Sequence, residues 1–163
     1  MATPDLPPCG LYRTTAAIGS IEAGRLVYFH NHGDPGPGMY LPERWTRNRA
    51  TFASRGTTAP DGFDPKALMP LPREGFYRVA RTFHCCEKKC VEFPPEAFVQ
   101  LGYNGKGEAL LFLPELVGGG FEIPDRGTRL DDNVLGNLVP LQVRERGDQR
   151  DDLAPFPRGL IVH

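Results

Sequence analysis

The chain has 163 residues and a formal net charge of −1, with 40% hydrophobic and 24% charged residues. A disordered chain would have fewer apolar residues and less balanced charge, so a folded protein is expected. The near-zero charge gives no overall electrostatic attraction to nucleic acid or to an anionic membrane. The 19 glycines and 17 prolines favour many short strands over long helices, because both residues interrupt helices and form turns.

The N-terminal segment 1–9 is a proline-rich arm without the basic start and apolar run of a secretory signal. No later stretch approaches the ~18 apolar residues of a membrane span. We therefore expect a cytoplasmic protein that does not enter a membrane. In that compartment the four cysteines are reduced, which suits packing, metal binding or redox chemistry better than a disulfide framework.

From residue 10 onward, five motifs of the first half recur in the same order in the second half, at spacings of 65 to 72 residues. The matched pairs are Gly10-Leu-Tyr-Arg13 with Gly75-Phe-Tyr-Arg78, Leu26-Val-Tyr-Phe29 with Phe98-Val-Gln-Leu101, Met39-Tyr-Leu-Pro-Glu43 with Leu111-Phe-Leu-Pro-Glu115, Arg55-Gly-Thr57 with Arg126-Gly-Thr128, and Leu68-Met-Pro-Leu71 with Leu138-Val-Pro-Leu141. Five matches in register indicate a tandem duplication.

The repeat divides the chain into four segments. They are the arm (1–9), a first β repeat (10–74), a second β repeat (75–146), and a polar linker with an apolar tail (147–163). The second repeat carries an insertion at about 83–96 that the first lacks, and three of the four cysteines lie in it.

Each repeat contains short apolar runs bounded by turn residues, which predict strands. In the first repeat these runs are 11–17, 26–32, 39–41, 50–53 and 68–71. Five short strands in so small a unit are typical of an SH3-like barrel, and because such a unit has a thin core alone, the two copies should pack together. We therefore predict an all-β protein, a tandem duplication of a small SH3-like five-stranded barrel. An oligonucleotide-binding-type barrel and one fused sandwich remain alternatives.

The insertion contains four candidate metal ligands within seven residues: His84, Cys85, Cys86 and Cys90. Zinc prefers thiolate and imidazole ligands, so zinc is the cofactor that this cluster would suit, although none is required by the sequence. Cys86 and Cys90 could share an ion in a turn, whereas adjacent Cys85 and Cys86 would face opposite sides of a strand. The spacing lacks the paired Cys-x-x-Cys pattern, so a redox pair and plain loop thiols stay open.

A second group of candidate ligands follows the second predicted strand. His30 and His32 are two residues apart, which places both on one side of a strand, and Asp34 could be a third ligand. Two histidines alone do not complete a zinc site, so a role in capping the strand end competes with metal binding.

The one locally basic stretch runs from Arg44 to Arg55 and carries the single tryptophan. Its candidate partner-binding residues are Arg44, Trp45, Arg47, Arg49 and Arg55. Arginine and aromatic side chains are enriched at protein interfaces and also bind nucleic acid, and the alternative is a solvated loop or short helix anchored by Trp45. Asp61 and Asp131, at matching places in the two repeats, suggest turn capping.

No catalytic motif is present, which favours a non-catalytic role while leaving enzymatic activity undecided. The leading hypothesis is a protein-binding adaptor or regulator built from two SH3-like repeats. The alternatives are a zinc-binding protein that uses the cysteine cluster, and nucleic-acid binding through the Arg44–Arg55 stretch, which the net charge disfavours. The sequence leaves the oligomeric state open.

Overall fold

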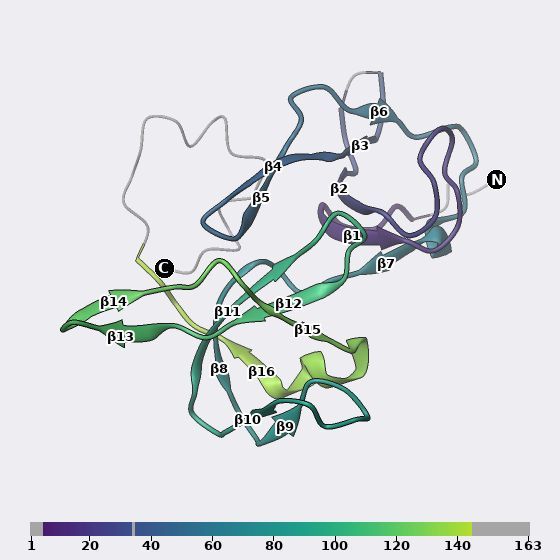
Figure 1. Ribbon diagram of the computed structural model, residues 1–163. Helices are drawn as coiled ribbons and strands as arrows, with labels where there is room; N and C mark the ends of the chain where they lie inside the picture. Colours follow the sequence, from purple (N-terminus) through teal and green to yellow (C-terminus); the bar gives the residue numbers. More distant parts are fainter. Residues whose placement is uncertain (1–4, 34, 145–163) are drawn as a thin grey trace.

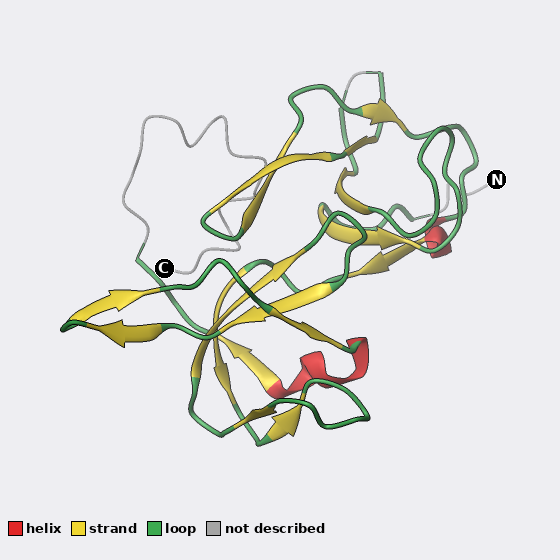
Figure 2. Cartoon of the chain, in the orientation of Figure 1, coloured by secondary structure: helices red, strands yellow, loops and turns green. Residues whose placement is uncertain are grey.

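The computed structural model describes residues 5–33 and 35–144. Asp34 and the predicted linker and tail (147–163) lie outside the described residues. The described part is built from strands, with two short 3-10 helices, η1 (Pro65–Ala67) and η2 (Asp132–Asn137), which confirms the all-β class (Figure 2). In this part of the chain no helix is long and apolar enough to cross a membrane.

Two five-stranded antiparallel sheets form the body of the molecule (Figure 1). The first has the order β6-β3-β2-β1-β7, from β1 (Gly10–Thr14), β2 (Leu26–His30), β3 (Gly38–Tyr40), β6 (Thr57–Thr58) and β7 (Leu68–Pro70). The second has the order β15-β12-β11-β8-β16, from β8 (Gly75–Val79), β11 (Phe98–Tyr103), β12 (Ala109–Phe112), β15 (Thr128–Leu130) and β16 (Leu138–Pro140). The two sheets therefore have the same strand order, and the strand that comes first along the chain, β1 or β8, is fourth across its sheet.

The two sheets also share their register. Tyr12 pairs with Val27 in the first sheet, and Tyr77 pairs with Val99 in the second. Met39 faces Thr57 as Leu111 faces Thr128. These paired positions are the ones that the sequence matches align.

A hairpin branches from the third strand of each sheet. In the first half β4 (Pro42–Thr46) pairs with β5 (Arg49–Phe52), and in the second β13 (Glu115–Val117) pairs with β14 (Gly120–Glu122). Both hairpins turn through two residues with positive φ, Arg47 and Asn48 in one and two glycines in the other, as tight β-hairpins require. The alternative of a solvated loop or short helix at the Arg44–Arg55 stretch is therefore wrong over its first part, whereas the strand predicted at 50–53 is present as β5.

The expectation of closed barrels is corrected by the pairing pattern. Each sheet has two end strands, β6 and β7 in one and β15 and β16 in the other, and these ends do not pair with each other among the described residues. The strands are short, so each sheet remains open along its edges.

The core spans both sheets. One buried cluster unites Leu11, Leu26 and Tyr28 of the first sheet with Tyr77 and the other inward side chains of the second. A second cluster, around Tyr12 and Phe29, lies on the other face of the first sheet. Alternation along β1 and β2 explains the division, because successive side chains of a strand face opposite sides.

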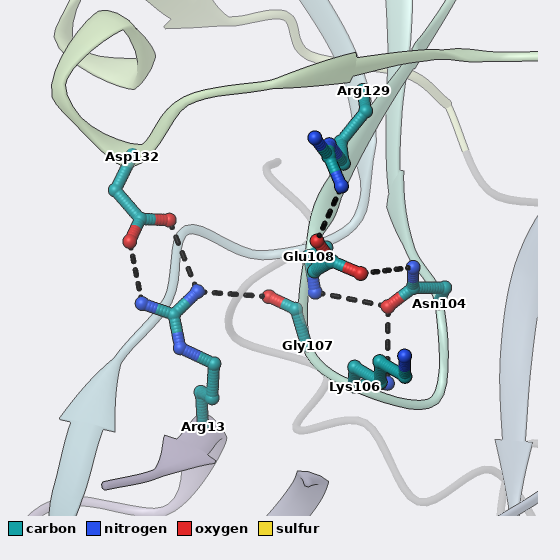
Figure 3. Close-up of polar contacts among 7 residues, drawn as sticks. All are labelled: Arg13, Asn104, Lys106, Gly107, Glu108, Arg129 and Asp132. Atoms are coloured by element: carbon teal, nitrogen blue, oxygen red, sulfur yellow. Dashed lines mark hydrogen bonds and ion pairs between the residues drawn. The ribbon is translucent and has the colours of Figure 1, made fainter. Parts of the chain in front are cut away.

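Direct contacts across the two halves are polar as well as apolar. Arg13 on β1 forms an ion pair with Asp132, Nη1 to Oδ1 at 3.1 Å, and donates to the Gly107 carbonyl at 3.3 Å (Figure 3). The Leu26 amide on β2 donates to the Gly105 carbonyl at 2.9 Å. The loop between β11 and β12 therefore lies against the first sheet.

The repeated Arg-Gly-Thr motif has a steric explanation. A Cβ at Gly56 would lie 2.8 Å from the ring of Tyr40, and a Cβ at Gly127 would lie 2.9 Å from the ring of Phe112. Tyr40 and Phe112 occupy equivalent places on β3 and β12. Each glycine therefore provides room for the aromatic ring of its own half.

The capping predicted for Asp61 and Asp131 is not observed as expected. Asp131 precedes η2 without a side-chain capping bond. In the first half the side chain of Asp64 accepts from the Lys66 amide at the start of η1. The residue that directly precedes η1 is Asp64 and not Asp61, so Asp64 is the residue whose side chain can reach the first free amides of this 3-10 turn.

Candidate metal centres

The residues predicted as an insertion fold as their own small hairpin. The connection from β8 to β11 covers 80–97, seven residues longer than the 15–25 connection from β1 to β2. It contains β9 (Phe83–His84) and β10 (Glu92–Phe93). Phe83 and Phe93 pair across the hairpin with ring centroids 5.0 Å apart and both are buried, so they anchor it in the core.

The loop of this hairpin holds the three cysteines. The Cys85 amide donates to the Val91 carbonyl at 3.0 Å, which closes the loop at its base. The Lys89 amide donates to the Cys86 carbonyl at 3.0 Å, and Lys89 has a positive φ of 54°. A turn centred on residues 87 and 88 therefore returns the chain and places Cys90 beside Cys86.

The sulfur atoms of Cys85, Cys86 and Cys90 form one group. The distance from Cys85 Sγ to Cys86 Sγ is 3.5 Å, and from Cys86 Sγ to Cys90 Sγ it is 3.8 Å. Zinc bound tetrahedrally with Zn–S bonds of about 2.3 Å separates neighbouring sulfurs by about 3.8 Å. The observed spacing is thus that of ligands around one ion, and it is too long for a disulfide bond.

The electrostatics of the loop favour a thiolate at Cys86. Hydrogen bonds from the backbone N–H of Cys90, from the Cys85 side chain and from the backbone N–H of Lys88 lower the pKa of Cys86. The pKa of Cys90 is raised, first by its hydrogen bond with Cys86 and then by the charge of that group. A bound cation would favour the thiolate form of all three cysteines, because metal binding displaces the thiol protons.

The structure brings Cys85 into this group and leaves His84 out of it. The argument that adjacent cysteines face opposite sides does not apply, because β9 ends at His84 and Cys85 and Cys86 lie in the loop beyond it. Cys85 is buried, Cys86 half-buried and Cys90 exposed, so the group opens to solvent on the Cys90 side.

The histidines after β2 belong to a different group. His30 and His32 lie beside Cys9, the last residue of the arm, with Cys9 Sγ 3.7 Å from the Nδ1 atom of each. The predicted third ligand, Asp34, is outside the described residues. Cys9 was not among the sequence candidates, although the pairing of Gly10 with Phe29 puts residue 9 next to residue 30.

The basic stretch lies largely on the β4–β5 hairpin, which reaches across to the second sheet (Figure 1). Trp45 is 43% exposed, and its indole N–H donates to the Tyr103 carbonyl at 2.7 Å. Arg47 and Arg49 border a surface depression with Phe76 and Phe121. Arg44 is exposed on β4, and Arg55 follows the hairpin and is exposed. Trp45 therefore both anchors the hairpin within the chain and presents surface to solvent.

No protein-family model matches the chain, and no curated protein or solved structure was found to match it.

Proposed function

We propose that the chain is a zinc-binding protein whose site is formed by Cys85, Cys86 and Cys90. The observation that carries the proposal is the spacing of the three sulfurs, 3.5 Å and 3.8 Å between successive pairs, at a single loop. Thiol–thiol hydrogen bonds also hold sulfurs at such distances, and a third thiol in the same group adds the donor set that a zinc ion requires. Thiolate donors in a tetrahedral arrangement favour zinc over hard cations such as magnesium or calcium.

Three thiolates would leave the fourth position of the ion for water or an external ligand. The net charge of such a centre is negative, and the neighbouring Lys88 and Lys89 offset it. The site needs reduced cysteines, so the proposal includes residence in a reducing compartment such as the cytoplasm.

The proposal extends to the architecture. We infer that the two halves arose by duplication of one SH3-like unit, which the second half modified by inserting the cysteine hairpin. The support is the common strand order and the register that coincides with the sequence matches. Zinc binding at this insertion is then a property that the second unit acquired and the first lacks.

The test is a competition titration of metal-free, reduced protein with a chromophoric zinc chelator. We expect Cys86→Ser and Cys90→Ser each to lose one tightly bound equivalent of zinc. His84→Asn is the matched control, because His84 neighbours the loop but is not in the sulfur group, and it should bind as the wild type does. If Cys86→Ser retains the zinc stoichiometry and affinity of the wild type, the proposal that Cys85, Cys86 and Cys90 bind zinc is wrong.

A second candidate function, protein binding, has its own observation. The β13–β14 hairpin projects from the second sheet (Figure 1), and it exposes 82% of Leu116 and 53% of Phe121. The corresponding β4–β5 hairpin is docked on β11 through Trp45. We infer that the β13–β14 hairpin and the exposed face of Trp45 bind a protein partner, as the adaptor hypothesis requires.

A pull-down with the wild type, Leu116→Ser and Trp45→Ala tests this second function. Partners recovered by the wild type should be reduced by Leu116→Ser. Equal recovery by all three proteins would exclude this surface. Val143→Ser, which removes an exposed apolar side chain near the end of the described chain, is the control.

A further inference from the structure

Cys9, His30 and His32 come from two parts of the chain that meet where β1 begins and β2 ends, in the interior of the first sheet. Cys9 ends the N-terminal arm, His30 is the last residue of β2, and His32 follows it by two residues. The Sγ–Nδ1 distances from Cys9 to both histidines are 3.7 Å. Around a tetrahedral zinc ion, a sulfur and a nitrogen ligand are separated by about 3.6 Å. Three donors thus converge at the spacing of a single coordination sphere.

The arm that carries Cys9 is fixed in position. The hydroxyl of Tyr12 donates to the Pro8 carbonyl at 2.7 Å, and Leu6 packs against the buried cluster of the first sheet. Cys9 is therefore held where it is by contacts that do not involve the histidines.

Asn31 lies between the two histidines and contacts the group. The Cys9 thiol donates to Asn31 Oδ1 at 3.3 Å, and His32 Nδ1 lies 2.9 Å from the same oxygen. The Asn31 amide donates to Cys9 Sγ at 3.4 Å, a bond that stabilises negative charge on sulfur. Burial, followed by the neighbouring His32, lowers the pKa of His30. The two rings lie 4.9 Å apart at 88°, and His30 also packs on Tyr28 at 5.3 Å.

The equivalent place in the second half has another use. The residues that correspond to Cys9, His30 and His32 there are Glu74, Gly102 and Asn104, as the strand registers align them. Glu74 accepts from the Ala50 amide at 3.0 Å, so the β4–β5 hairpin docks at this place in the second half. Among the described residues the β13–β14 hairpin has no comparable contact with the first sheet.

We propose that Cys9, His30 and His32 form a second metal centre, separate from the three-cysteine site, for a divalent transition-metal ion of zinc type. One thiolate and two imidazole nitrogens are donors of borderline softness, which select zinc or copper over magnesium and calcium. Three protein ligands leave a coordination position for water or an exogenous ligand. Metal binding here would fasten the N-terminal arm to the end of β2.

The centre is tested by counting zinc ions bound to reduced, untagged full-length protein in the same chelator competition. The wild type should bind about two equivalents, and Cys9→Ser and His32→Asn about one each. Cys86→Ser should also bind about one, through the Cys9 centre, and His84→Asn about two. If Cys9→Ser binds less zinc and Cys86→Ser does not, the result supports this centre and rejects the three-cysteine site. If neither Cys9→Ser nor His32→Asn binds less zinc than the wild type, the proposed Cys9–His30–His32 centre is wrong.

A second test follows the Cys9 thiol directly. Zinc should slow alkylation of Cys9 at least tenfold in the wild type, as read by peptide mass mapping after a timed pulse. Cobalt(II) in place of zinc should give thiolate charge-transfer absorption in Cys86→Ser, and adding Cys9→Ser to that variant should abolish it. A Cys9 alkylation rate that zinc does not change would contradict the proposal, whatever the stability of the variants.

Discussion

The indole N–H of Trp45, on the hairpin of the first half, donates to the carbonyl of Tyr103 on the second sheet at 2.7 Å. The turn of the same hairpin continues the contact, because Asn48 donates to the Gln100 side chain at 3.0 Å and Gln100 donates to the Arg47 carbonyl at 3.0 Å. The buried Gln100 amide is thereby satisfied at both ends. The β4–β5 hairpin therefore joins the two halves through hydrogen bonds to residues of β11.

Trp45→Phe removes the hydrogen bond and keeps most of the ring. We expect a loss of about 1 kcal/mol in the free energy of unfolding, measured by urea denaturation followed by circular dichroism. Leu116→Ala, at the corresponding position of the exposed hairpin, is the control and should change stability by less than about 0.5 kcal/mol. Equal effects of the two substitutions would mean that the Trp45 bond does not join the halves.

Gly102→Ala should disrupt the same contact from the other side. A Cβ at Gly102 would lie 2.6 Å from the Asn48 carbonyl oxygen, a distance at which the hairpin must move. We expect a destabilisation of about 2 kcal/mol by urea unfolding. Gly136→Ala, where an added Cβ meets nothing within 4 Å, is the matched control and should be nearly neutral. Equal stability of the Gly102→Ala and Gly136→Ala proteins would contradict the close approach of Gly102 to the Asn48 carbonyl.

Glu74 makes stability depend on pH. It is 4% exposed, and burial raises its pKa from 4.5 to about 7, against the opposing effects of the Ala50 hydrogen bond and the Arg49 charge. Since the folded state holds this proton more tightly than the unfolded state, the contribution is most favourable below pH 4.5 and declines as pH rises through 7.

Glu74→Gln keeps an acceptor for the Ala50 amide and removes the buried charge. Relative to the wild type, it should gain stability between pH 5 and pH 8, on the order of 3 kcal/mol at the alkaline end. Thermal unfolding of both proteins across this range measures the difference. The exposed Glu92→Gln is the control. A wild-type-to-variant difference that stays constant with pH would exclude a raised pKa at Glu74.

The ion pair of Arg13 with Asp132 links β1 to the start of η2. Both side chains retain solvent contact, 20% and 48% exposed, so the pair should contribute no more than about 1 kcal/mol. A double-mutant cycle with Arg13→Met and Asp132→Asn measures the coupling. The coupling energy should decrease when the salt concentration is raised. A coupling energy that does not change with salt concentration would contradict an electrostatic origin of this contact.

Much of the strand pattern could be predicted from the sequence because it is local. Alternating apolar residues and turn residues placed β1, β2, β3 and β7 within a few residues of their observed bounds. The matched motifs also predicted which residues of the two halves would be equivalent, and Tyr12 and Tyr77 have equivalent pairing partners.

The features that prediction missed depend on distant contacts. β4 reads as a charged loop, and it becomes a strand because Trp45 and Asn48 find partners on β11, more than 50 residues away. Cys9 has no ligand pattern of its own and joins the histidines only because β1 pairs with β2. Leu113 is apolar, but it is 38% exposed because it follows the end of β12.

Native mass spectrometry of the untagged chain, purified under reducing conditions and freed of loosely bound metal, tests the three-cysteine site most directly. The wild type should carry one zinc ion more than Cys86→Ser, with both proteins folded by circular dichroism. The same zinc content in the two proteins, including none in either, would contradict zinc binding by Cys85, Cys86 and Cys90.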